Sequence, residues 1–131
     1  MINCWRTFWY TVRMNTYSAK ENTAFNEAYK MLNADQKKAV DTIEGPVMVV
    51  AGPGTGKTQV LTLRIANILL KTDTSPNGIL ALTFTESGAK AMRERLRKYV
   101  GATAYQVPIY TFHGFAQILI SNYPDAYDRV I

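Results

Sequence analysis

The sequence predicts an α/β protein in which a parallel sheet is flanked by helices. Three short apolar runs have the composition of buried strands, and each is followed by residues at helical spacing. The strands are expected at residues 47–51, Ile79–Thr83 and Gln106–Tyr110. Strands that alternate with helices in this way are typical of parallel βαβ units. Pro108 places the third strand at an edge or an end, because proline cannot donate to a strand ladder.

Directly after the first strand, a glycine-rich segment has the composition of a phosphate-binding loop, or P-loop. It comprises Ala51, Gly52, Pro53, Gly54, Thr55, Gly56, Lys57 and Thr58. The glycines allow backbone conformations in which successive N–H groups surround phosphate oxygens, and the following helix adds its positive end. Lys57 can reach the β- and γ-phosphates, and the Thr58 hydroxyl can bind Mg²⁺. A nucleoside triphosphate is the expected ligand, and a turn that merely joins a strand to a helix is the alternative.

The strict form of this loop begins with glycine, whereas this chain has Ala51. Because that position closes the strand and does not touch phosphate, a methyl group there is expected to be tolerated. Lys57 and Thr58 are the catalytic candidates, and Thr58 is the candidate metal ligand.

Composition limits the class of protein further. The chain has 131 residues, 47% of them hydrophobic and 19% charged, as expected for one globular domain. Cys4 and His113 are the only residues of their kinds, so neither an internal disulfide nor a zinc site is expected. No run approaches the roughly 18 apolar residues of a membrane span, and residues 1–13 make a poor signal peptide, so a cytoplasmic protein without membrane contact is expected. The net charge of +5 favours a polyanionic partner.

Two helices are predicted before the loop. Residues 1–31 are expected to form an N-terminal extension, partly helical or disordered, with a helix from Lys20 to Leu32. Its inner face would carry Ala24, Phe25, Ala28 and Met31. Asn33 is the expected N-cap of the next helix, which runs to about Ile43, and Gln36 at the third helical position completes a capping box. Gly45 and Pro46 then end the helix.

Helical spacing also predicts the core-facing side chains of the later helices. The helix from Lys57 to about Leu70 presents Leu61, Ile65, Ile68 and Leu69; the helix Ser87–Val100 presents Ala89, Met92, Leu96 and Tyr99; and the helix His113–Asn122 presents Phe115, Ile118 and Leu119. The opposite face of the Ser87–Val100 helix is basic and carries Lys90, Arg93, Arg97 and Lys98. Glu86 with Lys90, and Glu94 with Lys98, have the spacing of ion pairs on a solvated helix. Phosphate binding is the alternative for this face.

Four segments in this order resemble the UvrD/Rep family of superfamily 1 DNA helicases. Leu32–Gln36 is similar to the family's adenine-reading Q motif, and Ala51–Thr58 to its phosphate loop, in which alanine at the first place is usual. Leu82–Thr85 with Ala89, Met92 and Arg95 resembles motif Ia, and Tyr110–Phe115 resembles motif Ib. The resemblance implies that residues 32–131 are the N-terminal part of the first motor domain. The implied fold is an incomplete P-loop NTPase (RecA-like) parallel sheet flanked by helices.

The resemblance also implies roles for single residues. Gln36 would pair with adenine through its amide, although the same side chain is needed for the capping box. With the loop and Gln59 it would bind ATP and Mg²⁺; many family members have arginine in place of Gln59, and its stacking on adenine is lost here. Single-stranded DNA would be contacted by Phe84, Thr85, Thr111 and His113. Phe84 would stack on a base and the polar side chains would contact phosphate, whereas a core aromatic and a structural histidine are the ordinary alternatives.

ATP hydrolysis in this family needs more than the loop. An acidic pair at the end of a further strand holds Mg²⁺, and arginines of a second motor domain stabilise the transferring phosphoryl group. None of the acids after the loop closes an apolar run, so the chain is expected to stop just before that motif and to be marginally stable alone. The implied whole protein is an ATP-dependent 3′ to 5′ DNA helicase in DNA repair, partnered by single-stranded DNA and the remainder of its polypeptide. The alternatives are a nucleotide-binding fragment without catalysis and a small P-loop kinase.

Overall fold

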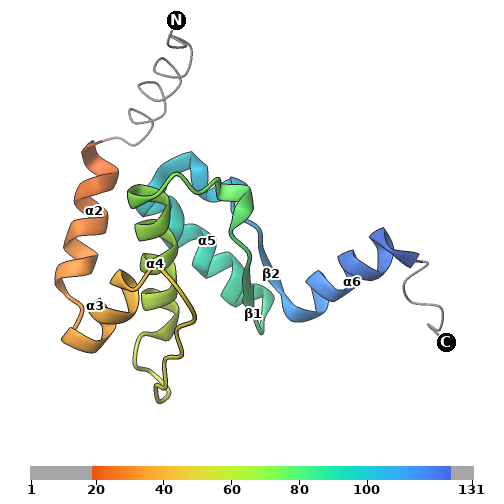
Figure 1. Cartoon of the computed structure of the whole chain (residues 1–131), viewed down its shortest axis with the longest axis horizontal. Coiled ribbons are helices and arrows are strands. Elements are labelled where there is room, and N and C mark those ends of the chain that lie inside the picture. Colours follow the sequence, from red (N-terminus) through yellow and green to blue (C-terminus); the bar gives the residue numbers. More distant parts are fainter. Residues whose placement is uncertain (1–18, 125–131) are drawn as a thin grey trace, which may run out of the picture.

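The computed structural model describes residues 19–124. The predictions for residues 1–18 and for the last seven residues of the chain therefore lie outside the described part. The helices are α2 (Ala19–Lys30), α3 (Ala34–Asp41), α4 (Lys57–Lys71), α5 (Glu86–Val100) and α6 (Phe112–Asn122), with short 3-10 helices η1 (Pro76–Gly78) and η2 (Gly101–Gln106). The strands are β1 (Ala81–Thr83) and β2 (Ile109–Thr111) (Figure 1).

The two strands confirm the predicted parallel βαβ unit. β1 pairs with β2 in parallel, with Ala81 opposite Ile109 and Thr83 opposite Thr111. α5 connects them and packs against both strands. Pro108 precedes β2, where its missing N–H costs no ladder bond, and its carbonyl accepts the Ala81 N–H at 2.9 Å. Both strands are shorter than predicted, because η2 takes up Gln106 and residues 79–80 stay outside the ladder.

The prediction of a buried strand at residues 47–51 is wrong for this structure. The segment forms no strand, and Met48 and Val50 are 88% and 89% exposed. Apolar composition favours a buried strand, but a strand also needs a neighbour to pair with, and β1 and β2 pair only with each other within residues 19–124.

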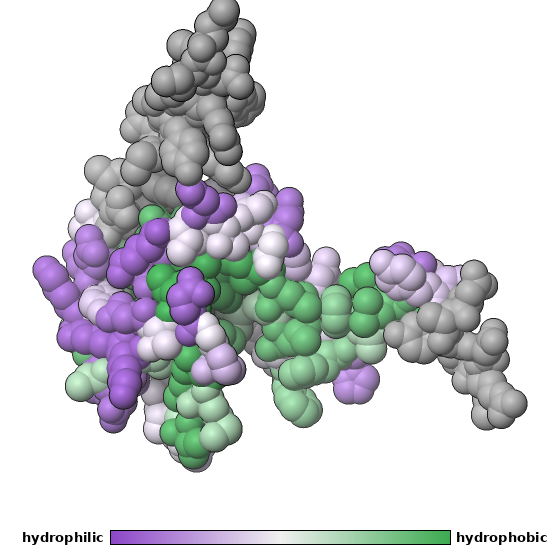
Figure 2. All heavy atoms as spheres, viewed as in Figure 1, coloured by the Kyte–Doolittle hydropathy of each residue, from purple (hydrophilic) through white to green (hydrophobic). Residues whose placement is uncertain are grey.

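Figure 2 shows hydrophilic side chains over α2 and α3 and hydrophobic surface toward the strand ends and α6.

The core is built between α4 and α5, which pack against each other, and α2 and α3 cover α4. Burial on α4 differs from the predicted stripe, since Leu61 is 38% exposed whereas Leu63 and Ala66 are fully buried. A single stripe assumes that one side of a helix is covered. α4 has neighbours on several sides, so residues off the predicted stripe are buried as well.

On α5 the prediction is confirmed, because Ala89, Met92, Leu96 and Tyr99 are all buried. On α6 it is wrong, because no residue of this helix is buried. α6 extends away from the rest of the described chain (Figure 1), and the Phe115 ring instead stacks on Tyr110 with ring centroids 6.3 Å apart. An apolar stripe shows that a face can be buried, but it does not supply the surface that buries it.

The helices before the loop largely follow the prediction. On α2, Phe25 is buried and its ring lies edge-on to Tyr99, with centroids 6.3 Å apart. Met31 is exposed, because α2 ends one residue earlier than this position. At the start of α3 the capping box of Asn33 and Gln36 is present.

Within residues 19–124, no helix combines the length and apolar character that crossing a membrane requires.

Candidate nucleotide and nucleic-acid site

Two of the three glycines in the loop have the backbone conformations that its composition predicted, whereas Gly52 does not have a positive φ. Gly54 and Gly56 have φ of 75° and 79°, in the left-handed region that side chains disfavour. Gly56 is the N-cap of α4, so Lys57 and Thr58 lie in the first helical turn. The first N–H groups of a helix have no partner within it, and they can therefore be donated to an anion at this end.

The lysine of the loop lies against the loop's own carbonyl oxygens. Lys57 Nζ donates to the Ala51 carbonyl at 3.3 Å and to the Gly52 carbonyl. The Thr55 hydroxyl also donates to the Gly52 carbonyl, at 2.7 Å. Lys57 and Thr58 are exposed, so a bound phosphate could exchange these carbonyl contacts of Lys57 for charge-assisted ones.

Gln36 serves the helix cap and touches the loop with the same side chain. Its Oε1 accepts the Asn33 N–H at 2.9 Å, and its Nε2 donates to the Thr55 carbonyl at 3.1 Å. The cap and the contact with the loop are thus divided between the two ends of the amide, and adenine pairing by Gln36 stays a prediction. A hollow of about 1020 Å³ adjoins this contact, and its lining includes Gln36, Gly52, Thr55 and Lys57.

Two polar side chains of α4 hold the helix that carries Gln36. Arg64 Nη1 donates to the Ala39 carbonyl at 2.8 Å, and Asn67 Nδ2 donates to the Val40 carbonyl at 3.0 Å. Asn67 is fully buried. Because the last carbonyls of a helix lack partners within it, these donors fix the end of α3 against the helix that follows the loop. The sequence pattern did not point to either residue, since polar residues on an amphipathic helix are normally assigned to solvent.

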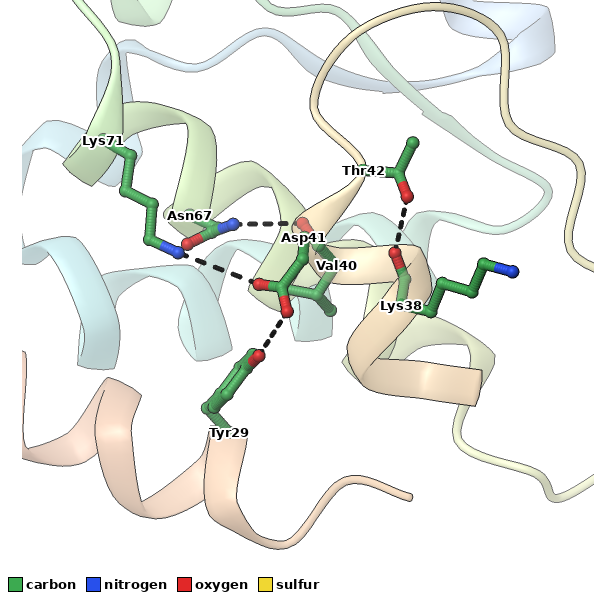
Figure 3. A network of polar contacts seen from close by, with 7 residues as sticks. All are labelled: Tyr29, Lys38, Val40, Asp41, Thr42, Asn67 and Lys71. Carbon is green, nitrogen blue, oxygen red and sulfur yellow. Dashed lines mark hydrogen bonds and ion pairs between the residues drawn. The ribbon is translucent and has the colours of Figure 1, made fainter. Parts of the chain in front are cut away.

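Asp41 at the end of α3 extends this network (Figure 3). Its carboxylate accepts the Tyr29 hydroxyl of α2 and lies 3.7 Å from Lys71 Nζ of α4. The hydrogen bond to Asp41 is the main cause that raises the pKa of Tyr29 above 10.0. Since the folded-state pKa is raised, this contribution to stability is present below pH 10.0 and is lost as pH rises through the folded pKa.

A second group of predicted site residues lies where β1 and β2 end. Phe84 follows β1 directly and is 83% exposed, so it is not a core aromatic. Phe112 follows β2, is also exposed, and meets Phe84 edge-on with ring centroids 5.8 Å apart. His113 beside it is exposed. We call these side chains, with Thr85 and Thr111, the strand-end edge; Phe112 was not predicted as a site residue.

The two threonines of the strand-end edge cap helices. Thr85 Oγ1 accepts the Gly88 N–H at 3.0 Å and so caps α5. Thr111 is 6% exposed; its hydroxyl accepts the Gly114 N–H and donates to Glu86 Oε1, each at 3.0 Å. A phosphate contact from Thr111 would have to replace the bond to Glu86, so its DNA role stays a prediction. Glu86, which links the first turn of α5 to β2, was not predicted either.

Gly88 lets the first turn of α5 approach the end of β1. A Cβ at this position would lie 2.9 Å from Thr83 Oγ1 and 3.0 Å from Thr85 Oγ1. We expect Gly88→Ala to lower the free energy of unfolding by about 1–3 kcal/mol, because the added methyl overpacks this junction. Urea unfolding followed by circular dichroism measures the change. Gly78→Ala is the matched control, because its Cβ would have no neighbour nearer than 3.9 Å; equal losses in the two variants would contradict the close approach.

Residues 19–124 thus form an α/β unit with exposed polar residues around the glycine-rich loop and exposed aromatic rings at the strand-end edge. The sequence profile of the UvrD/REP helicase N-terminal domain matches residues 32–130. The chain belongs to the UvrD/Rep helicase family.

Individual relatives agree with this assignment. The ATP-dependent DNA helicase PcrA of Staphylococcus aureus strain Mu50 is 47% identical over 88 residues. The protein of the same name from Staphylococcus epidermidis strain RP62A is 48% identical over 88 residues. Each similarity covers 67% of this chain and 12% of the relative, so the chain spans a small part of the length of these proteins.

Proposed function

We propose that residues 32–131 are the N-terminal part of the ATP-binding domain of an ATP-dependent DNA helicase, with a RecA-like fold. The observation that carries the proposal is the contact between Gln36 Nε2 and the Thr55 carbonyl at 3.1 Å. It places an amide able to pair with adenine beside the loop whose backbone suits phosphates. The relatives are named ATP-dependent DNA helicases, and these names support the same function.

In this proposal the parts of ATP are divided among the residues of the loop and α3. The N–H groups of Gly54, Gly56 and the first turn of α4 surround the phosphates, and Lys57 neutralises their charge. The exposed hydroxyl of Thr58 would hold Mg²⁺, which supplies further charge neutralisation when bound. Gln59, half-buried after the loop, takes the place of the stacking arginine.

Hydrolysis requires groups beyond these. Among the residues that line the hollow, Asp35 has the one carboxylate, and it lies in the first turn of α3, not at the end of a strand. We propose that the acidic pair and the transition-state arginines come from the remainder of the helicase polypeptide. A strand of that remainder would also cover the exposed residues 47–51, and the described residues by themselves would bind nucleotide without turning it over.

Single-stranded DNA would be held at the strand-end edge. Exposed aromatic rings beside short polar side chains suit a strand without sequence preference, because every base offers a face for stacking. Phe84 and Phe112 provide the rings and His113 a donor to phosphate. The family resemblance implies 3′ to 5′ movement on this strand.

Adenine recognition is tested by Gln36→Glu. The new carboxylate can still accept the Asn33 N–H, which preserves the capping box, but it has no N–H to donate to adenine N7. We expect the ratio of ATP to GTP affinity to fall about 5- to 150-fold, since a bidentate amide pair contributes about 1–3 kcal/mol of base discrimination. Titration calorimetry with the two nucleotides measures the ratio. Gln117→Glu on the exposed surface of α6 makes the same charge change, and an unchanged ratio in both variants would show that Gln36 is only a cap.

A further inference from the structure

The basic face of α5 lines a groove separate from the glycine-rich loop. A hollow of about 780 Å³ lies between α5, η2, β2 and the start of α6. Its lining includes four cationic side chains, Lys90, Arg93, Arg97 and Lys98, against the two carboxylates of Glu86 and Glu94. We call this hollow the α5 groove. Neither the nucleotide site nor the strand-end edge accounts for its cations.

The ion pairs that the helical spacing predicts on this face are not formed. Neither Glu86 with Lys90 nor Glu94 with Lys98 comes within the 4.0 Å of an ion pair, whereas Lys71 lies 3.7 Å from Asp41, far from the α5 groove in sequence. Glu86 accepts the Thr111 hydroxyl instead of pairing with Lys90. Lys90, Arg97 and Lys98 therefore keep their charges available to a ligand, and a groove lined by unpaired cations attracts a polyanion.

Arg93 is held rigidly at the wall of the groove. Its Nη2 donates to the Ile109 carbonyl at 3.0 Å, and its buried Nε has no hydrogen-bond partner. The bond to Ile109 anchors the guanidinium against β2, and its positive charge stays at the wall of the groove. A guanidinium fixed at the groove wall favours phosphate groups, because two of its N–H groups can bind two phosphate oxygens at once.

Two tyrosines make the groove more than a charged surface. Tyr105 and Tyr110 line it and are exposed. Arg97 Nη1 lies 3.4 Å from the Tyr105 hydroxyl, so a cation and an aromatic ring adjoin. Cations that follow a backbone, with aromatic rings on which bases stack, are the combination that binds single-stranded nucleic acid. An acidic peptide would use the cations but would bring no base to stack on the exposed rings.

The α5 groove also continues from the strand-end edge. Glu86, Thr111 and Gly114 line the groove, and the same residues form the junction between β2 and the first turns of α5 and α6. From there Lys90 and Arg97 lie seven positions apart on α5, about 10 Å along the helix axis. A strand held at Phe84 and Phe112 would therefore enter the groove at Thr111, the one residue of the strand-end edge that lines it.

We propose that the α5 groove binds the phosphate backbone of single-stranded DNA as it continues beyond the strand-end edge. The inference rests on the proposed function, because that edge must hold DNA for the strand to continue from it. A strand long enough to reach both surfaces then gains contacts with Lys90 and Arg97 that a short strand cannot make. The groove contributes affinity and salt dependence, not base reading.

The test compares two strand lengths with the 131-residue chain. Fluorescence anisotropy measures binding of labelled oligothymidylates of roughly 4 and 12 nucleotides, across the range of site sizes of single-strand binding surfaces, at several salt concentrations. In the double variant Lys90→Gln/Arg97→Gln, the slope of log K against log salt for the long strand is expected to fall by about 1.4, or 0.7 per phosphate contact. The affinity of this double variant for the long strand at low salt should fall about 10-fold, and its affinity for the short strand should equal that of the parent chain.

Matched variants separate the groove from net charge. Lys30→Gln/Arg95→Gln removes the same charges from exposed positions on α2 and on α5 outside the groove. Equal slopes in the two double variants would overturn the proposal. Displacement of the long strand by polyglutamate as effectively as by DNA of equal charge would also overturn it, in favour of an acidic peptide.

The proposed function is tested separately in the same assay. Phe84→Ala is expected to weaken both strand lengths, because stacking at the strand-end edge is common to them. If it weakens neither while the groove variant still weakens the long strand, the edge assignment fails, and with it the continuation of the strand from the edge, although the groove itself binds DNA. Circular dichroism spectra that match the parent chain show that each variant is folded.

Discussion

Replacing Lys57 with alanine is expected to weaken MgATP binding roughly 100-fold, which corresponds to about 2.7 kcal/mol. The lysine lies over the Ala51 and Gly52 carbonyls and is exposed, so it can turn to the phosphates without unfolding the loop. Its removal deletes charge-assisted contacts, each contributing about 1.5–3 kcal/mol. Titration calorimetry on the parent chain and the variant measures the difference.

A control for this result comes from another exposed lysine. Lys30→Ala on α2 removes the same charge away from the residues that line the hollow. Its affinity for MgATP should match that of the parent chain. If Lys57→Ala bound MgATP as tightly as Lys30→Ala, the phosphates would not lie in the glycine-rich loop, and the proposed nucleotide site would be wrong.

Leu63→Ala is expected to lower the free energy of unfolding by about 3–5 kcal/mol. Leu63 is fully buried on α4 and belongs to the hydrophobic core. Truncating such a side chain removes its burial and leaves a cavity that the surrounding helices fill only in part. Chemical denaturation measures the loss, and a chain of small total stability would be largely unfolded by it.

Leu61→Ala, two positions earlier on the same helix, is the matched control. Leu61 is 38% exposed, so the same truncation should cost less than about 1 kcal/mol. Which of the two variants loses more stability distinguishes the structure from the helical pattern, because the pattern predicted Leu61 in the core and did not include Leu63. A larger loss at Leu61 than at Leu63 would mean that α4 is rotated relative to the structure described.

Local chemistry made some elements predictable. The capping box needs only Asn33 and Gln36 three residues apart, and a positive φ at Gly56 needs only a residue without Cβ. The core face of α5 was predictable because its buried side chains keep the helical spacing, although α2, α4, η2 and both strands contact this helix. In each case the information lies within a few residues of chain.

Packing against distant elements could not be predicted in the same way. Residues 47–51 are apolar enough for a strand but have no neighbour to pair with in the described chain. α6 has an apolar stripe but extends away from the core, so its residues stay uncovered. Periodicity reports which face a helix or strand can bury, and only the arrangement of the other elements decides whether it does.

In the candidate site, too, residues with a local sequence pattern could be predicted and contacts between distant elements could not. The loop and Gln36 carry a pattern that requires their residue types, and the structure brings them into contact. Arg64 and Asn67 hold α3 through its carbonyl groups, which no side-chain pattern records. The bond between Thr111 and Glu86 spans 25 positions and appears only when α5 and β2 are side by side.

Proton–nitrogen correlation NMR of the 131-residue chain can locate both ligands, since we propose a nucleotide site at the loop and a DNA site at the strand ends of one chain. MgATP should shift the amide signals of Gly54, Gly56 and Lys57 and the side-chain amide of Gln36. Oligothymidylate should shift those of Phe84 and Phe112 and leave the loop unchanged. The two proposed sites would be contradicted if MgATP shifted other amide signals but none in the loop. They would also be contradicted if oligothymidylate shifted other signals but neither that of Phe84 nor that of Phe112.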